Sequence, residues 1–245
     1  VRALLRLSFG GPNARIIVQN SDDSNLVANS RIVEQSQIRL IRGSGVDCAR
    51  FSPVEEGSES ARANGRVRVL LASRLLWDKG LREYVAAARQ LLSNGRNAEF
   101  LLAGDPDEGN PATVSEQEVR RWMEEGILDW IGHVYDMPEL YRSVDIVVLP
   151  SYREGLPKGL IEAAACGLPR VTTDVPGCRE VVTDGVDGLL VPVRDSHALA
   201  SAIARLCDDP ALRERLGKAA RKKALVEFDE RIVIEQTLNV YRELI

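Results

Sequence analysis

Residues 145–166 read DIVVLPSYREGLPKGLIEAAAC, a short apolar run followed by a polar loop and a second apolar segment. The run from Asp145 to Leu149 predicts a buried strand, because its four consecutive apolar residues are mostly β-branched. Pro157 suits the first turn of a helix, which we predict from Lys158 to Cys166. A strand followed closely by a helix is the unit from which parallel sheets are built.

The same pattern of strand and helix repeats on both sides of this stretch, from Arg66 onward. Further strands are predicted at Val67 to Ala72, Glu99 to Ala103, Asp129 to Gly132, Arg170 to Thr173 and Gly188 to Val191. Further helices are predicted at Leu81 to Leu92, Glu116 to Glu125, Met137 to Ser143, Ser196 to Cys207, Ala211 to Val226 and Glu230 to Ile245. This alternation predicts an α/β fold in which helices flank a parallel sheet.

The segment before Arg66 follows a different pattern. Its features in chain order are a helix-like stretch at Ala3 to Leu7, a strand-like run at Arg15 to Val18, a turn at Asn20 to Asp23, a helix, a second run at Gln37 to Ile41 and a polar stretch at Ser52 to Asn64. The polar stretch is expected to be a connection. Because the chain starts at Val1 without an initiator Met, we expect it to be part of a longer protein.

The composition is that of an ordinary globular protein. The chain has 245 residues, 44% hydrophobic and 28% charged, with a formal net charge of −4. Lys and Arg are scattered, so no basic stripe indicates a nucleic-acid partner. The four cysteines form no C-x-x-C pair and there are two histidines, so neither a zinc site nor a disulfide scaffold is indicated.

No apolar run reaches the roughly 18 to 20 residues of a membrane-spanning helix, and no signal peptide is recognisable at the start. We therefore expect a soluble, cytoplasmic protein with reduced thiols. Peripheral contact with a membrane stays open.

Two cations follow the first strand of the predicted sheet. Ligands of open parallel sheets collect at the carboxyl ends of the strands, so the loops that follow them are where chemistry is expected. Arg74 and Lys79 lie on one such loop, beside the start of a helix, where both could meet a diphosphate. The alternative is that both are solvated surface charges.

Two carboxylates flank the start of the helix after Leu149. Glu154 precedes this helix and Glu162 lies within it, with seven residues between them. An ionised carboxylate only accepts hydrogen bonds, which fits the hydroxyl groups of a ribose or a hexose. Glu162 has apolar neighbours, so we predict a buried carboxylate rather than one on a solvated helix face. Gly155 allows the backbone to approach a ligand closely.

These residues resemble the signature of glycosyltransferase family 4, the group 1 glycosyltransferases. The resemblance rests on Arg74 with Lys79-Gly80, Glu154-Gly155-Leu156-Pro157-Lys158 and Glu162-Ala163, which includes the Glu-x7-Glu motif. It continues through Leu149 to Ser151, Gly167 to Pro169, Thr172 to Gly177 with Glu180, and Asp184 to Pro192. Upstream, Gln19 to Asp23, Gly43 to Asp47 and Phe51 to Pro53 are similar to the end of the family's first domain and the crossover from it.

The resemblance implies the GT-B architecture, in which two Rossmann-like domains face a cleft and the second holds the nucleotide-sugar. On this interpretation residues 1–45 are a remnant of the N-terminal, acceptor-side domain. Residues 46–66 are the crossover linker, and 67–245 are the donor-binding domain with its C-terminal helices. A chain without most of its first domain is expected to bind the donor more readily than to turn it over.

The resemblance also implies the catalytic group. Arg74 and Lys79 would clamp the donor diphosphate and stabilise the departing nucleoside diphosphate, so neither a metal nor a cofactor is expected. Glu154 would bind hydroxyls of the transferred sugar. The family retains the anomeric configuration, with the acceptor attacking the face from which the diphosphate leaves.

The implied substrate-binding group surrounds these residues. Backbone amides of Gly155, Leu156 and Lys158 would lie near the phosphates, Glu162 would hold the ribose hydroxyls, and main-chain groups near Val134 would border the base. Two positions depart from the family pattern, where Gly159 replaces a branched apolar residue and Arg170 another apolar residue.

The function implied is a retaining hexosyltransferase that moves a sugar from a nucleotide-diphosphate sugar, most commonly a UDP-sugar, to a glycan or lipid-linked acceptor. The Glu-Gly-Leu-Pro-Lys form of the motif is similar to bacterial surface-polysaccharide enzymes, which would place the protein at the inner face of the membrane. The alternatives are a non-catalytic nucleotide-sugar-binding module and a GT-B sugar-nucleotide epimerase. A dinucleotide oxidoreductase is disfavoured, because no G-x-G-x-x-G follows a strand.

Overall fold

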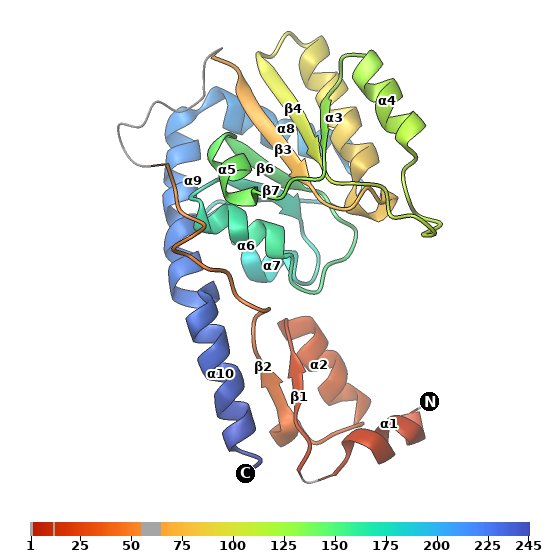
Figure 1. Cartoon of the computed structure of the whole chain (residues 1–245), viewed down its shortest axis with the longest axis vertical. Coiled ribbons are helices and arrows are strands. Elements are labelled where there is room, and N and C mark those ends of the chain that lie inside the picture. The colour runs from red at the N-terminus through yellow and green to blue at the C-terminus, as the bar shows by residue number, and fades with distance from the viewer. Residues whose placement is uncertain (1, 12, 55–64) are drawn as a thin grey trace.

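A six-stranded parallel sheet is the centre of the computed structural model, which describes residues 2–11, 13–54 and 65–245 (Figure 1). The strands are β3 (Val67–Ala72), β4 (Ala98–Ala103), β5 (Asp129–Gly132), β6 (Ile146–Leu149), β7 (Arg170–Thr173) and β8 (Leu189–Val191). Their order in the sheet is β5-β4-β3-β6-β7-β8. Each predicted strand is confirmed to within one residue at either end, and so is the α/β class.

Helices cover both faces of this sheet, because successive strand residues point to opposite sides. Val69 and Leu71 face one apolar core and Leu70 faces the other. The first core is covered by α3 (Leu81–Ser93), α4 (Glu116–Glu124) and α8 (Ser196–Asp208). The second is covered by α5 (Met137–Arg142), α6 (Lys158–Ala165) and α7 (Cys178–Val181), and α9 (Pro210–Lys223) contributes to both.

Apart from shifts of up to three residues at their ends, the helices differ from the prediction at two places. The segment predicted as one helix from Ala211 to Val226 is α9 followed by a π-helical turn, Ala224–Phe228. Asp229 then caps the next helix, α10 (Glu230–Arg242), because its side chain accepts a hydrogen bond from the Arg231 amide. The short helix α7 was not predicted, since four residues are too few to show a helical period.

The N-terminal part forms a smaller parallel sheet of β1 (Ile16–Val18) and β2 (Ile38–Leu40) with the helices α1 (Arg2–Phe9) and α2 (Ser21–Ser30). The predicted turn at Asn20 to Asp23 is wrong, because Asn20 is the N-cap of α2 and its side chain accepts a hydrogen bond from the Asp23 amide. Most of the predicted connection from Ser52 to Asn64 lies outside the described residues, since 55–64 are not among them.

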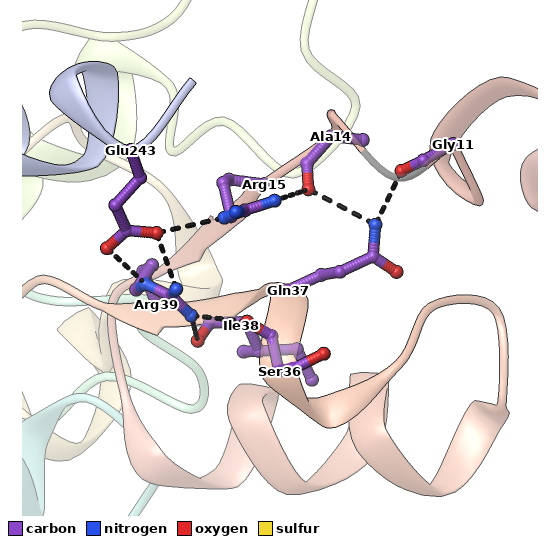
Figure 2. Close-up of polar contacts among 8 residues, drawn as sticks. All are labelled: Gly11, Ala14, Arg15, Ser36, Gln37, Ile38, Arg39 and Glu243. Carbon is purple, nitrogen blue, oxygen red and sulfur yellow. Dashed lines mark hydrogen bonds and ion pairs between the residues drawn. The ribbon is translucent and has the colours of Figure 1, made fainter. Parts of the chain in front are cut away.

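Helix α10 joins the smaller sheet to the rest of the molecule (Figure 1). Beyond its last turn, the Glu243 carboxylate accepts hydrogen bonds from Arg15 Nε at 2.9 Å and Arg39 Nε at 3.0 Å (Figure 2). Ile41 packs with two apolar residues of α10 in a separate small cluster. The segment before β3 is therefore held by contacts from the end of the chain.

The buried Arg170, which departs from the family pattern, finds its partner inside the fold. Its side chain is fully buried at the start of β7, and Nη2 lies 2.7 Å from Asp187 Oδ1. Burial lowers the pKa of Arg170 to about 10, and Asp187 opposes that shift. The guanidinium also donates to the Leu160 carbonyl of α6 at 3.4 Å, so it supports the helix that carries Glu162.

Candidate active site

A cavity of about 180 Å³ lies at the carboxyl ends of β3 and β6, between the loop after β3 and the start of α6. Four of the predicted site residues line it, namely Arg74, Lys79, Glu154 and Lys158. Its position follows the rule that open parallel sheets bind ligands beyond the carboxyl ends of their strands.

Lys79 and Glu154 form an ion pair at this cavity. Lys79 Nζ lies 2.7 Å from Glu154 Oε1, and the two side chains are only 18% and 12% exposed. Their loops are joined by a hydrogen bond of 2.8 Å from the Tyr152 amide to the Asp78 carbonyl. The fold thus brings a cation and a carboxylate from separate loops into one partly dehydrated site.

Gly80 allows these two loops to approach. Its φ is +79°, and a Cβ added there would lie 2.1 Å from the Pro150 carbonyl oxygen. Only glycine accommodates both the left-handed backbone and this contact. Gly80 therefore allows the loop that carries Lys79 to pack against the loop that carries Glu154.

Arg74 is paired with a different carboxylate, that of Asp107. Its side chain is 65% exposed, and Nη1 lies 2.7 Å from Asp107 Oδ2 on the loop after β4. This is the exposed arrangement that the sequence left open as an alternative to diphosphate binding. A phosphate at the cavity would have to draw Arg74 away from Asp107.

Helix α6 begins at the edge of the cavity. Pro157 is its N-cap residue, and the first-turn residues Lys158 and Gly159 line the cavity. First-turn amides are not used within a helix, and they carry the positive end of its dipole. This end of α6 suits an anionic group such as phosphate.

The predicted burial of Glu162 agrees with the structure, where its side chain on α6 is 14% exposed. Burial raises the pKa of Glu162, against the opposing effects of Lys158 and Tyr141. The Tyr141 hydroxyl lies 3.1 Å from the Gly159 carbonyl and 3.5 Å from Glu162 Oε2. A Cβ added at Gly159 would lie 3.3 Å from that hydroxyl, so the absent side chain leaves room for Tyr141.

Besides Glu162, three predicted residues do not line the cavity. Gly155 is exposed, and its carbonyl accepts a hydrogen bond of 2.8 Å from Asn20 Nδ2. Leu156 and Val134 are partly buried and pack against the second apolar core. The roles predicted for these three residues belong to their backbone groups.

Sequence reasoning missed Asp107, Tyr141 and Asn20. Asp107 lies in a polar loop with no distinguishing pattern, and Tyr141 occupies an ordinary apolar position of a helix. Asn20 did carry a signal, because Asn before Ser-Asp-Asp is typical of a helix N-cap, but nothing in the sequence connects it with Gly155.

A larger cavity, of about 610 Å³, lies at the opposite ends of the strands, where Asp145 and Pro169 precede β6 and β7. Its Arg213 and Arg221 side chains donate hydrogen bonds to main-chain carbonyls. Those guanidinium groups are engaged by the fold itself. We therefore place the candidate site at the smaller cavity.

Within the described ranges, no three His, Cys, Asp or Glu side chains are grouped as ligands for a metal ion would be. In the same part of the chain, every helix is too short or too polar to cross a membrane.

The fold and the cavity define an α/β protein of the GT-B type, with a basic and acidic site at the carboxyl ends of its strands. Residues 55–223 match the family described as glycosyl transferases group 1, and the chain belongs to this family. The resemblance seen in the motifs is thereby confirmed.

Among its relatives is the N,N'-diacetylbacillosaminyl-diphospho-undecaprenol alpha-1,3-N-acetylgalactosaminyltransferase of Campylobacter jejuni, which is 32% identical over the whole chain. The capsular polysaccharide biosynthesis glycosyltransferase CapM of Staphylococcus aureus is 30% identical over 69% of the chain. The chain spans 64% of the first protein's length and 44% of the second's.

Two solved structures share the fold over 99% of the chain. Anabaena Alr3699/HepE in complex with UDP has a TM-score of 0.85, 22% identity and 68% of its own length covered. The sucrose-phosphate synthase of Thermosynechococcus elongatus has a TM-score of 0.81, 29% identity and 60% of its length covered.

Proposed function

We propose that this chain is the donor-binding half of a retaining glycosyltransferase that works without a metal ion. The observation that carries the proposal is the partly buried ion pair of Lys79 and Glu154 beside the start of α6. A nucleotide-sugar has both an anion for the lysine and the helix end, and hydroxyl groups for the carboxylate. We assign residues 1–45 to the acceptor-side domain, 46–66 to the crossover and 67–245 to the donor domain.

The diphosphate would lie between Lys79 and the first-turn amides of α6. There the lysine exchanges its Glu154 partner for phosphate, and Arg74 can add a second charge when it leaves Asp107. These groups stabilise the negative charge that builds up on the departing nucleoside diphosphate, which is the role a metal ion plays elsewhere. In this scheme Arg74, Lys79 and Glu154 act directly on the reacting donor.

Glu154, released from Lys79, would accept hydrogen bonds from hydroxyls of the transferred sugar. Gly155 and Leu156 follow it in the chain, and their amides would border the phosphates together with Lys158. A retaining transfer requires the acceptor to approach the face that the diphosphate leaves. Phosphate oxygens then help to take the acceptor's proton.

Glu162 would hold the ribose, and main-chain groups at Val134 would border the base. Glu162 fits this role because its carboxylate is largely buried and oriented by Tyr141. We propose uridine as the nucleoside, which the UDP and UDP-glucose complexes of the Anabaena protein support.

For the acceptor we propose a glycan or a lipid-linked glycan of bacterial surface-polysaccharide synthesis. Two relatives support this proposal, because one acts on an undecaprenol-linked sugar and the other is a glycosyltransferase of capsular polysaccharide biosynthesis. Such an acceptor would bring a cytoplasmic protein into peripheral contact with the inner face of the membrane.

Calorimetric titration with UDP, GDP and ADP, with and without Mg²⁺, tests the proposal. We expect metal-independent binding of UDP, weakened at least tenfold in Glu162→Ala and about five-fold in Arg74→Ala. Arg89→Ala is the matched control, because Arg89 forms an exposed ion pair with Glu125 away from the cavity. Absence of binding to all three nucleotides would overturn the proposal in favour of a non-binding module.

A further inference from the structure

Asn20 connects two parts of the chain that lie far apart in sequence. Its side chain is fully buried, at 0% exposure. Oδ1 accepts a hydrogen bond of 2.7 Å from the Asp23 amide, and Nδ2 donates bonds of 2.8 Å to Asp23 Oδ2 and to the Gly155 carbonyl. One amide group thus caps α2 and holds the residue that follows Glu154.

The loop held by Asn20 is enclosed from other sides as well. A Cβ added at Gly177 would lie 2.4 Å from the Gly155 carbonyl oxygen and 2.6 Å from that of Glu154. A Cβ added at Gly43, which precedes the larger sheet, would lie 2.6 Å from Leu156 Cδ2. The backbone of residues 154–156 is therefore fixed between the N-terminal segment and the loop after β7.

A second polar contact fixes the same N-terminal segment. The Glu180 carboxylate accepts hydrogen bonds from the Ser21 amide at 2.7 Å and from Arg42 Nε at 3.0 Å. Burial alone would raise the pKa of Glu180, but these bonds lower it. Contacts on both sides therefore fix the position of Asn20. A residue that orients another group must itself be held in place.

We propose that Asn20 is a positioning residue that sets the sugar-binding loop 154–156 from the opposite side of the site. The inference rests on the proposed donor-binding function. Without the amide donor the Gly155 carbonyl loses a buried partner, so the backbone that carries the Glu154 carboxylate is free to shift. Small displacements of a binding group strongly reduce the interactions that depend on its geometry.

The two roles of Asn20 can be separated by substitution. Serine is also a good N-cap, so Asn20→Ser keeps the cap of α2 but cannot reach the Gly155 carbonyl. Asn20→Ala loses both functions. Ser115→Ala is the matched control, because Ser115 caps α4 away from the loop by accepting a hydrogen bond from the Glu118 amide.

The experiment titrates uridine and UDP-N-acetylgalactosamine into the 245-residue chain and its variants and follows thermal unfolding. The proposed contacts of uridine, with Glu162 and the main chain near Val134, lie outside residues 154–156, so its affinity is the internal reference. We expect the ratio Kd(UDP-sugar)/Kd(uridine) to rise about five- to tenfold in both Asn20 variants and to stay unchanged in Ser115→Ala. Only Asn20→Ala and Ser115→Ala should lose thermal stability through the missing cap.

A wild-type ratio in Asn20→Ser would overturn the inference, while binding of the wild-type chain would leave the proposed function intact. If the wild-type chain binds neither ligand, the proposed function falls, and the role of Asn20 falls with it.

Discussion

At the scale of single residues, the site consists of charges that already have partners. Lys79 is paired with Glu154 and Arg74 with Asp107. The sequence identified both cations and the two glutamates, because they stand at fixed spacings around the ends of predicted strands. It could not indicate which carboxylate each cation meets, since Asp107 joins Arg74 only through the folded loops.

Releasing Arg74 should strengthen nucleotide binding. Asp107→Asn removes the charge that holds the guanidinium, and exposed pairs of this kind contribute a few tenths to one kcal/mol. We expect UDP to bind about two- to fivefold more tightly in calorimetry. The gain should vanish in the double variant with Arg74→Ala, and a gain that persists there would show that Arg74 does not meet the ligand.

Replacing Glu162 should stabilise the folded chain at neutral pH. Burial raises the pKa of Glu162 from the ordinary 4.5, so the folded chain favours the protonated form. The free energy of unfolding therefore falls as the pH rises from 4.5 through the raised pKa. The Glu162→Gln variant lacks this ionisable group, so its free energy of unfolding does not fall in this way. Thermal unfolding should give the variant the higher Tm at pH 7 and equal values below the ordinary pKa. A lower Tm at pH 7 would contradict this assignment.

At the scale of elements, sequence patterns located the strands well and the helix boundaries less well. A buried strand such as Ile146–Leu149 is a continuous apolar run, which indicates its own limits. The junction of α9 and α10 gives no such signal, because the π-helical turn at Ala224–Phe228 keeps a helix-like composition. Contacts between neighbouring helices, such as that of Tyr141 in α5 with Gly159 in α6, depend on packing that no local pattern encodes.

The loop before α3 should tolerate no side chain at Gly80. Gly80→Ala combines a left-handed φ with overlap against the Pro150 carbonyl, and we expect it to lower the free energy of unfolding by about 3 kcal/mol or more. Gly95→Ala is the control, because Gly95 also has a positive φ of +73° but nothing lies within 4 Å of an added Cβ. It should cost about 1 kcal/mol. Urea unfolding measures both, and equal losses would contradict the proposed contact.

At the scale of the whole molecule, the end of the chain holds its beginning. Arg39, together with Arg15, holds the pKa of Glu243 at about 2, so the contact is present above the ordinary pKa and is lost as the pH falls through about 2. No sequence pattern pairs residues more than two hundred positions apart. The change of pattern before Arg66 indicated a separate part of the chain, and the family resemblance supplied its assignment to a first domain.

Removing this contact should loosen the smaller sheet and leave the larger one unchanged. Glu243→Gln removes the ion pairs of Glu243 with Arg15 and Arg39, and we expect faster amide hydrogen exchange in β1 and β2 than in the wild type. Exchange in β3 should not change. Glu116→Gln is the control, because it breaks only an exposed pair with Arg120 within α4. Equal exchange of β1 and β2 in both variants would contradict the role of Glu243.

The paired state of Lys79 has a consequence for how binding responds to salt. Cations without internal partners attract mobile counterions, and a phosphate that displaces those ions gives an affinity that falls steeply as salt rises. Here the phosphate displaces a carboxylate that belongs to the protein, so few ions are released to the solvent. Donor affinity should therefore depend only weakly on ionic strength, and the freed carboxylate becomes available at the moment the sugar arrives.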